Sequence, residues 1–296
     1  MRRSTTTRRT TTRLSLASAF TDLIAEIGVR PWCLGVSGCI LFCGCALADG
    51  VRPWDLTLGA GVASMPLYRG ASSSHPRLRL WLDAEYRTAN LGSFAIDSGS
   101  LTIDPELRWN AIDRPDLGFG PLLGYRFGRN DKDPRFVSSD DGSSRLQGLP
   151  DVDSTVDAGV QGHVLVSGVP VFAQIRSALS GAQGTLLNLG LYLPWSPDDA
   201  FTLTVLPTVT WANARQMHAF YGVSPLASSS SGFAVYTPGA GWENAALELA
   251  GEWRVSKSAH LVASVAFERL LDDAARSPIV QSRSQRSVLG GVTWSF

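Results

Sequence analysis

Apolar and polar residues alternate with a period of two along residues 287–296, the last stretch of the chain. One face carries the apolar and aromatic residues, which are Val288, Gly290, Val292, Trp294 and Phe296. A period of two predicts a β-strand, because successive side chains point to opposite sides of the backbone. An apolar face that ends in aromatic residues is typical of a strand that faces lipid.

The same alternation recurs in one segment after another. In residues 77–87 one face is Leu78, Leu80, Leu82, Ala84 and Tyr86, and the other is Arg77, Arg79, Trp81, Asp83, Glu85 and Arg87. Residues 101–110 and 242–255 follow the same scheme. The polar faces combine Arg with Asp and Glu and contain almost no Lys. Opposite charges that satisfy one another suit the lumen of a barrel better than a surface in water.

We therefore predict an all-β fold, an antiparallel up-and-down transmembrane β-barrel of about twelve strands. The predicted strands are 54–64, 76–88, 91–97, 100–111, 116–128, 153–167, 169–180, 184–194, 200–213, 242–255, 260–271 and 284–296. After residue 48 the chain has no apolar run of 18 residues, so we do not expect a membrane-spanning helix.

The connections between these strands fall into two classes. The predicted periplasmic turns are short and lie at 89–90, 112–115, around Gly168, 195–199 and 256–259. The predicted external connections are mostly long and lie at 65–75, 98–99, 129–152, 181–183, 214–241 and 272–283. Short periplasmic turns and long external loops are typical of outer-membrane barrels. Aromatic residues near the strand ends predict the two interfacial girdles.

The front of the chain has the layout of a secretory signal peptide. A basic, Thr-rich start is followed by an apolar run over 32–47 and by the small-x-small triplet Ala46-Leu47-Ala48. We predict a signal peptide over 1–48 and the barrel over 49–296. A lipoprotein signal at Cys39 is an alternative. All four cysteines lie within 1–48, so we expect no disulfide in the mature barrel.

The charges are balanced. Of the 26 basic and 26 acidic residues, six arginines and two acidic residues lie within 1–48, which leaves 20 basic and 24 acidic residues in the predicted barrel. This balance gives no reason to expect a nucleic-acid partner. We predict a lumenal charge network that fills a narrow barrel; its members include Arg77, Arg79, Asp83, Glu85, Arg87, Asp104, Glu106, Arg108, Arg126, Arg176, Glu248 and Glu252.

We expect no enzymatic activity, no cofactor and no metal site. The four histidines are His75, His163, His218 and His260, and none stands in a recognisable catalytic motif. Ser72, Ser73 and Ser74 beside His75 are adjacent in sequence, which is not the geometry of a triad. The chain contains no nucleophile elbow, no HExxH and no phosphate-binding loop.

Three stretches carry a family resemblance. They are residues 120–129 (GPLLGYRFGR) with 146–153 (LQGLPDVD), residues 220–224 (FYGVS) with 231–233 and 236–239, and residues 269–280 (RLLDDAARSPIV). Together they resemble the MipA/OmpV family of outer-membrane proteins, whose founding member is named for its interaction with a lytic transglycosylase. The resemblance spans essentially the whole predicted barrel. The predicted leader is longer than is usual for the family.

The resemblance implies a barrel in the outer membrane of a Gram-negative bacterium. For one branch of the family it implies a scaffold between a murein hydrolase and a peptidoglycan synthase. For other branches it implies a narrow, porin-like channel for small solutes or a surface adhesin that uses external loops. Further expected partners are outer-membrane lipids and the barrel assembly machinery, for which Trp294 and Phe296 form the C-terminal assembly signal.

The family motifs also mark two external loops. We predict that loop 214–241 folds into the barrel mouth, with a ligand or partner contact as the alternative. The motif residues expected to matter in these loops are Tyr221, Gly222, Val223, Ser224, Tyr236, Asp272, Ser277 and Pro278. Asp272 and Asp273 are neighbours and would face opposite ways on an extended strand, so we do not expect them to act as a catalytic carboxylate pair.

Overall fold

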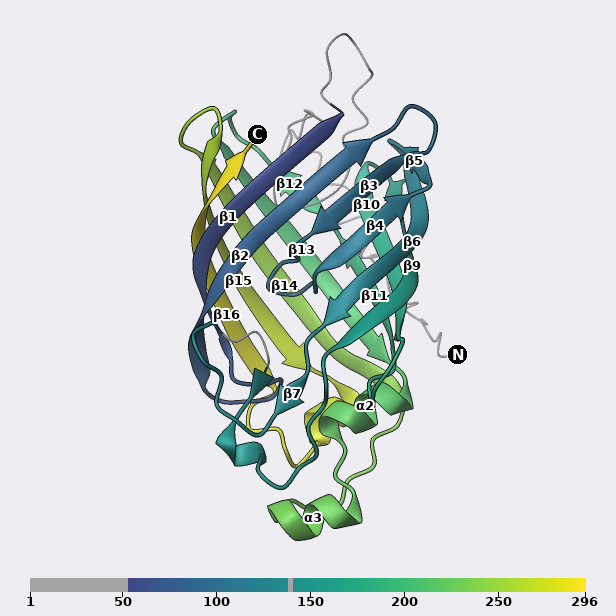
Figure 1. Ribbon diagram of the computed structural model, residues 1–296, viewed down its shortest axis with the longest axis vertical. Helices are drawn as coiled ribbons and strands as arrows, with labels where there is room; N and C mark the ends of the chain where they lie inside the picture. The colour runs from purple at the N-terminus through teal and green to yellow at the C-terminus, as the bar shows by residue number, and fades with distance from the viewer. Residues whose placement is uncertain (1–52, 138–140) are drawn as a thin grey trace, which may run out of the picture. The chain divides into compact units, whose positions relative to one another are not determined.

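The computed structural model describes residues 53–137 and 141–296. The predicted signal peptide and the four cysteines lie outside the described residues. The described strands form a closed antiparallel barrel with twelve wall positions, as the alternation predicts. Figure 1 shows the strands tilted across the wall, with the helices gathered at one end. That end is external, because the long loops emerge there.

The wall strands lie close to their predicted positions. Two wall positions are interrupted, so that β5 extends β4 and β12 extends β11. In chain order the wall consists of β1 (Trp54–Pro66), β2 (Ser74–Arg87), β3 (Ser93–Asp97), β4 (Glu106–Asn110) with β5 (Ile112–Arg114), β6 (Leu117–Arg126), β9 (Thr155–Val166), β10 (Val169–Ala178), β11 (Thr185–Leu191) with β12 (Leu193–Trp195), β13 (Phe201–Ala212), β14 (Gly241–Arg254), β15 (Ala259–Leu270) and β16 (Ser284–Ser295).

Closure of the ring depends on two pairings. β1 pairs with both β2 and β16, so the first and last strands of the barrel meet. β11 and its continuation β12 both pair with β13, so the wall is also continuous on that side. Pairing of the strands around the ring leaves few free sheet edges, which is the condition under which β-structure can cross a bilayer.

The two faces of the wall differ as the period of two predicts. On β2, Leu78, Leu80 and Leu82 are exposed on the outside, while Arg77 and Trp81 are buried inside. The apolar exterior is flanked by exposed aromatic residues near the strand ends, among them Trp54, Trp109, Tyr125, Trp242, Trp253, Trp294 and Phe296. This arrangement matches the apolar band and aromatic girdles of a membrane barrel. None of the described helices is both long and apolar enough to cross a membrane.

One predicted strand is partly wrong. Residues 98–105, predicted to be a two-residue connection followed by the start of strand 100–111, form a loop between the short strands β3 and β4. Gly99 has a left-handed φ of 76°, and Pro105 lacks the N–H that a strand interior would donate. Leu101 and Ile103 alternate with Thr102 and Asp104 as in a strand, but the segment turns into the lumen instead.

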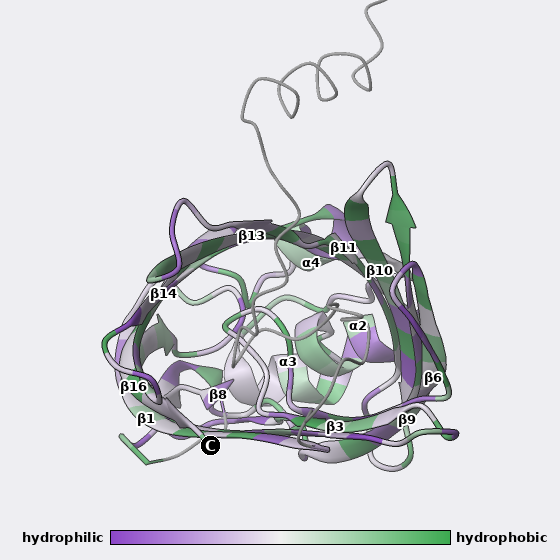
Figure 2. Cartoon of the chain, turned by 90° about the horizontal axis from the view of Figure 1, so that it is seen from above, coloured by the Kyte–Doolittle hydropathy of each residue, from purple (hydrophilic) through white to green (hydrophobic). Residues whose placement is uncertain are grey.

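The external loops fold over and into the barrel mouth. They carry β7 (Arg129–Asn130), β8 (Asp141–Gly142), η1 (Ser144–Leu146), α2 (Ala214–Tyr221), α3 (Pro225–Ser231) and α4 (Asp272–Arg276). Figure 2 shows α2 and α3 within the outline of the strand ring. Met217 and Tyr221 of α2 pack with Leu270 and Ala274, and a second buried cluster joins Tyr68, Leu146, Val223 and Ile279. We call these packed loops the plug.

Inward-facing glycines make room for large lumenal side chains. A substitution of Gly61 on β1 would test this interpretation. A Cβ at Gly61 would overlap the Gly290 carbonyl oxygen and lie 2.9 Å from the Trp81 ring. We expect Gly61→Val to destabilise the barrel by about 1–3 kcal/mol, as overpacking does. The measurement is the urea midpoint of the heat-modifiable gel band.

The control for this experiment is the same substitution at Gly290. Gly290 lies on the lipid-facing side of β16, and a Cβ there meets nothing within 4 Å. Gly290→Val should leave the midpoint near that of the wild type. Equal midpoints for the two variants would show that Gly61 is not required for close packing against Trp81.

Candidate functional site

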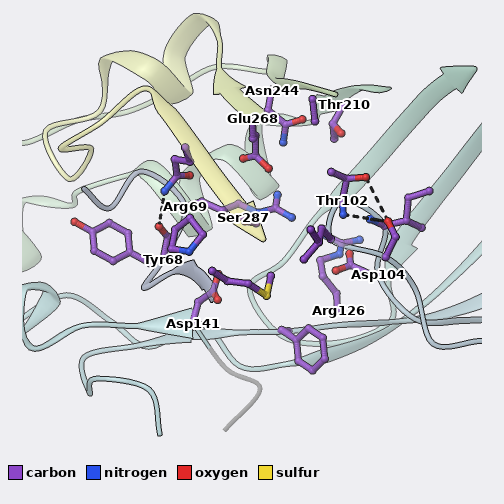
Figure 3. Close-up of a pocket in the computed structure, with 18 of the residues that line it drawn as sticks. Tyr68, Arg69, Thr102, Asp104, Arg126, Asp141, Thr210, Asn244, Glu268 and Ser287 are labelled. Atoms are coloured by element: carbon purple, nitrogen blue, oxygen red, sulfur yellow. Dashed lines mark hydrogen bonds between the residues drawn. The ribbon is translucent and has the colours of Figure 1, made fainter. Parts of the chain in front are cut away.

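A cavity of about 170 Å³ lies in the external half of the lumen, between the plug and loop 98–105. Figure 3 shows Thr102, Asp104 and Arg126 on one side and Tyr68, Arg69 and Asp141 on the other. The charged side chains that line it, within the described part of the chain, are Arg69, Arg77, Arg79, Arg126, Arg176, Asp104, Asp141 and Glu268. We call this cavity the chamber.

At the roof of the chamber an ion pair with a buried carboxylate ties the external loops to the wall. Arg69, in the β1–β2 loop, donates to Glu243 at 2.6 Å, and the Tyr221 hydroxyl donates to the same carboxylate at 2.9 Å. Burial alone would lower the pKa of Arg69, but the charges of Glu243 and Glu268 outweigh it and raise that pKa well above its usual value. Burial and the neighbouring Glu243 raise the pKa of Tyr221. Arg69 therefore stays charged and Tyr221 stays a hydrogen-bond donor at any ordinary pH.

Other plug contacts involve the family motifs. Ser277 donates from Oγ to the Tyr221 carbonyl at 2.7 Å, and Val223 forms a two-way backbone bridge with Tyr236. Ser224 caps α3, since its Oγ accepts from the Ala227 N–H. Gly222 follows α2 as its C-cap, and Pro278 lies next to Ser277 in the last external loop.

The neighbouring acidic pair Asp272 and Asp273 also serves the plug. Asp272 accepts from the Trp242 N–H at 3.1 Å, and Asp273 accepts from the Gly239 N–H at 2.7 Å. Asp273 also pairs with Arg276, which donates to it. The Gly239 N–H and Arg276 together lower the pKa of Asp273. The two carboxylates thus bind separate backbone groups, Asp273 in the loop that precedes β14 and Asp272 at the start of β14.

Loop 98–105 forms the floor of the chamber and spans the lumen. Ser100 and Thr102 donate their hydroxyls to Glu248 on β14 at 2.7 and 2.8 Å. On the other side, Asp104 accepts from Arg176 on β10 at 2.6 Å. The loop is therefore fastened at once to two strands on different parts of the wall, and it closes much of the lumen at this level.

The same loop is also held by β2. Asp83 accepts from both the N–H and the hydroxyl of Ser98, at 2.8 and 2.6 Å. Arg79 donates to the Ser98 carbonyl. These contacts fix the point at which the chain leaves β3 and turns inward.

Several residues of the predicted charge network form ion pairs. Arg126 binds Asp157 at 2.7 Å, and Arg77 binds Asp141 at 3.0 Å. Towards the periplasm Arg108 lies 3.4 Å from Glu106, which also accepts from Gln174. Lower still, Glu252 pairs with His260, and Arg87 binds Asp55 and Glu85 at the exposed rim. Whether this network has a role beyond filling the lumen stays a prediction.

Sequence reasoning missed several residues that build the chamber. Arg69, Glu243, Gln216 and Ser100 all contribute buried or bridging contacts, including a 2.7 Å bond from Arg126 to Gln216. Three of them lie in loops, where no periodicity marks which side chains point inward. The alternation of β14 would have placed Glu243 on the outer face with Leu247 and Leu249. It is buried because the register between β13 and β14 shifts at Thr210 and Trp211.

The described residues show little that resembles catalytic chemistry. His75 lies at the external end of β2 and bonds to the neighbouring Pro76 carbonyl, and the His163 ring lies against Gly118. In the ranges 53–137 and 141–296 no three His, Cys, Asp or Glu side chains are grouped so that they could hold a metal ion. The chemistry that the chamber offers is ionic binding and hydrogen bonding.

The closed antiparallel ring and its apolar exterior define the class of protein, an outer-membrane β-barrel. The family described as MltA-interacting protein MipA matches residues 58–296. The chain therefore belongs to the MipA family, and the resemblance seen in the sequence is confirmed.

Two curated relatives are the MltA-interacting proteins of Escherichia coli K12 and Shigella flexneri. Each is 25% identical to this chain over 167 residues, which cover 54% of this chain and 64% of the relative. The match thus spans less than two thirds of each relative.

Solved outer-membrane barrels are also similar to this chain. OmpT of Vibrio cholerae has a TM-score of 0.39 at 8% identity, covering 82% of this chain and 97% of that one. The translocator domain of the autotransporter NalP from Neisseria meningitidis has a TM-score of 0.40 at 10% identity, covering 84% and 90%. A bacterial polysaccharide outer-membrane secretin has a TM-score of 0.41 at 9% identity, covering 84% and 99%.

The ion pair in the roof should decide how firmly the plug stays docked. The Glu243 side chain is fully buried, so Arg69→Met would leave a buried carboxylate without its cation. Breaking such a pair costs about 3 kcal/mol or more. We expect loop 214–241 to be cleaved by proteinase K up to about a hundred times faster, because cleavage follows the population of the open form.

The matched control is Arg276→Met. The Arg276 side chain is 62% exposed and its ion pair with Asp273 lies at the surface, where such pairs contribute little. Its cleavage rate should stay near that of the wild type. An unchanged rate for Arg69→Met would mean that the hydrophobic clusters hold the plug without the ion pair.

Proposed function

We propose that this protein is a non-enzymatic scaffold of the outer membrane, which binds a murein hydrolase, and through it a peptidoglycan synthase, at its periplasmic rim. The observation that carries the proposal is the doubly obstructed lumen: the plug closes the mouth, and loop 98–105 crosses the interior below it. The family and its relatives named for interaction with MltA support the choice of partner.

The obstruction argues against a general diffusion pore. Such a pore needs a continuous aqueous path, whereas the chamber holds about 170 Å³ between two layers of bonded side chains. That volume is below the roughly 300–1,000 Å³ of ordinary small-molecule pockets. A barrel that is filled in this way offers a partner its rim rather than its interior.

The periplasmic rim offers exposed charges for a small contact surface. Asp113 lies in β5, Asp199 in the turn before β13, and Lys257 in the turn between β14 and β15; all three are exposed. The turns are short, so the contact would be polar and modest in area, as in transient complexes. Charge complementarity would then dominate its association rate and its specificity.

If the partner binds at the rim, reversing the charges there should lower the affinity for the murein hydrolase. The double variant Asp113→Lys/Asp199→Lys should weaken capture of the cell's own MltA-type murein hydrolase by the detergent-solubilised barrel. The reason is that the two substitutions change the local charge by about four units across one docking surface. The measurement is the apparent Kd by surface plasmon resonance at low and at physiological salt.

The control carries the same charge change at the external end. Asp131→Lys/Asp151→Lys places two lysines in loop 129–152, which would be on the far side of the membrane from the hydrolase. It should bind like the wild type. No measurable binding by folded wild-type barrel, or equal loss in both variants, would overturn the scaffold proposal.

A narrow channel for small solutes is the second candidate, because the chamber is an internal space lined by charged and polar side chains. A channel predicts discrete openings in planar bilayers that change when Arg79→Gln or Glu106→Gln removes a lumenal charge. A scaffold predicts silent bilayers from protein whose gel migration is heat-modifiable. Reproducible wild-type openings would therefore favour the channel.

A further inference from the structure

The barrel wall has a lateral notch on its external half. On β2 only residues 84–87 pair with β3, and on β6 only residues 122–124 pair with β4. Among the described strands, none lies between residues 74–83 of β2 and the external end of β6. Figure 1 shows β3 and β4 as short arrows between the longer β2 and β6. The notch exists because loop 98–105 turns into the lumen instead of continuing the wall.

The chamber reaches this notch from the inside. Its lining includes Leu78 on one edge, Phe127 just beyond β6 on the other, and Ile103 and Pro105 at the base. Leu78 points outward and is 37% exposed on the lipid-facing side, yet it also lines the chamber. The chamber therefore reaches the notch, whose border is apolar. The Leu78 N–H donates to the Phe136 carbonyl at 2.6 Å, so the external loop covers part of the notch.

Two arginines of the chamber keep donors for an anion. Five arginines among the described residues line the chamber, and three of them, Arg69, Arg77 and Arg126, are held by carboxylates. Arg176 is 3% exposed and binds Asp104 through Nη2, and within 53–137 and 141–296 its Nη1 has no hydrogen-bond partner. The guanidinium of Arg79 donates to a carbonyl oxygen, that of Ser98, and not to a carboxylate. Both arginines thus have donor capacity for a ligand oxygen.

We propose that the chamber binds the anionic head of an acyl-chain amphiphile that enters sideways from the membrane. The carboxylate or phosphate lies at Arg79 and Arg176, and the chain leaves through the notch between β2 and β6 along Leu78 and Phe127. A volume of about 170 Å³ accommodates such a head but not the chain. The apolar border of the notch supplies the surface that the chain needs.

Displacement of a fluorescent fatty acid from the full-length barrel in dodecyl maltoside tests this proposal. Laurate and dodecyl phosphate should both displace the probe. The ratio of the concentrations at which each displaces half of it tells which head group the site prefers. Dodecanol, butyrate and inorganic phosphate should each be at least about tenfold weaker, because each lacks either the charge or the chain. Dodecanol as effective as laurate, or butyrate as effective as laurate, would overturn the proposal.

Two matched variants locate the site. Arg79→Gln should weaken both anionic amphiphiles about tenfold while dodecanol is unaffected. Leu78→Trp adds bulk at the notch and should also weaken both anions, whereas Val62→Trp should not. Val62 is the cross-strand partner of Leu78 on β1, is 47% exposed, and does not line the chamber. Equal effects at Leu78 and Val62, in variants with normal heat-modifiable migration, would show that the notch is not the route.

Discussion

The structure depends above all on satisfying backbone hydrogen bonds where no water is available. A strand in lipid must pair on both sides, because each unpaired peptide group there costs several kcal/mol. The pairings of β1 with β16 and of β11 with β13 close the ring and meet this requirement. Closure in turn encloses every second side chain, so the residues that cannot face lipid are brought together in the lumen.

The enclosed side chains then have to satisfy one another. Charges that are removed from bulk water need partners, and here Arg126 with Asp157 and Arg69 with Glu243 are close pairs with buried carboxylates. Such pairs add little net stability relative to an apolar core, but an unpaired partner is costly. They therefore select one arrangement of the external loops over others, since the β1–β2 loop must lie in the mouth for Arg69 to reach Glu243 on β14.

The wall of the barrel was predictable from sequence and the interior was not. Lipid on one side and polar groups on the other impose a period of two, so the twelve wall positions can be predicted from local residues alone. Arg69 and Glu243 are 174 residues apart, and Ser100 and Glu248 are 148 residues apart. No local pattern reports a contact across the lumen. The prediction for residues 98–105 was wrong for the same reason. These residues alternate like a strand, but their side-chain partners lie on β10 and β14.

The notch and the obstructed lumen are consequences of a single departure from the regular wall. If loop 98–105 continued β3 and β4 towards the external end, it would close the space between β2 and β6. Glu248 and Arg176 would then lose their present partners in this loop. Turning inward, it satisfies those two side chains and leaves one edge of β2 without a neighbouring strand. The Leu78 N–H on that edge donates to the Phe136 carbonyl at 2.6 Å, so the external loop covers part of it. The acyl chain proposed above would lie along the outward-facing leucines beside the rest of that edge. The inward turn of loop 98–105 therefore links the obstruction of the lumen to the notch in the wall.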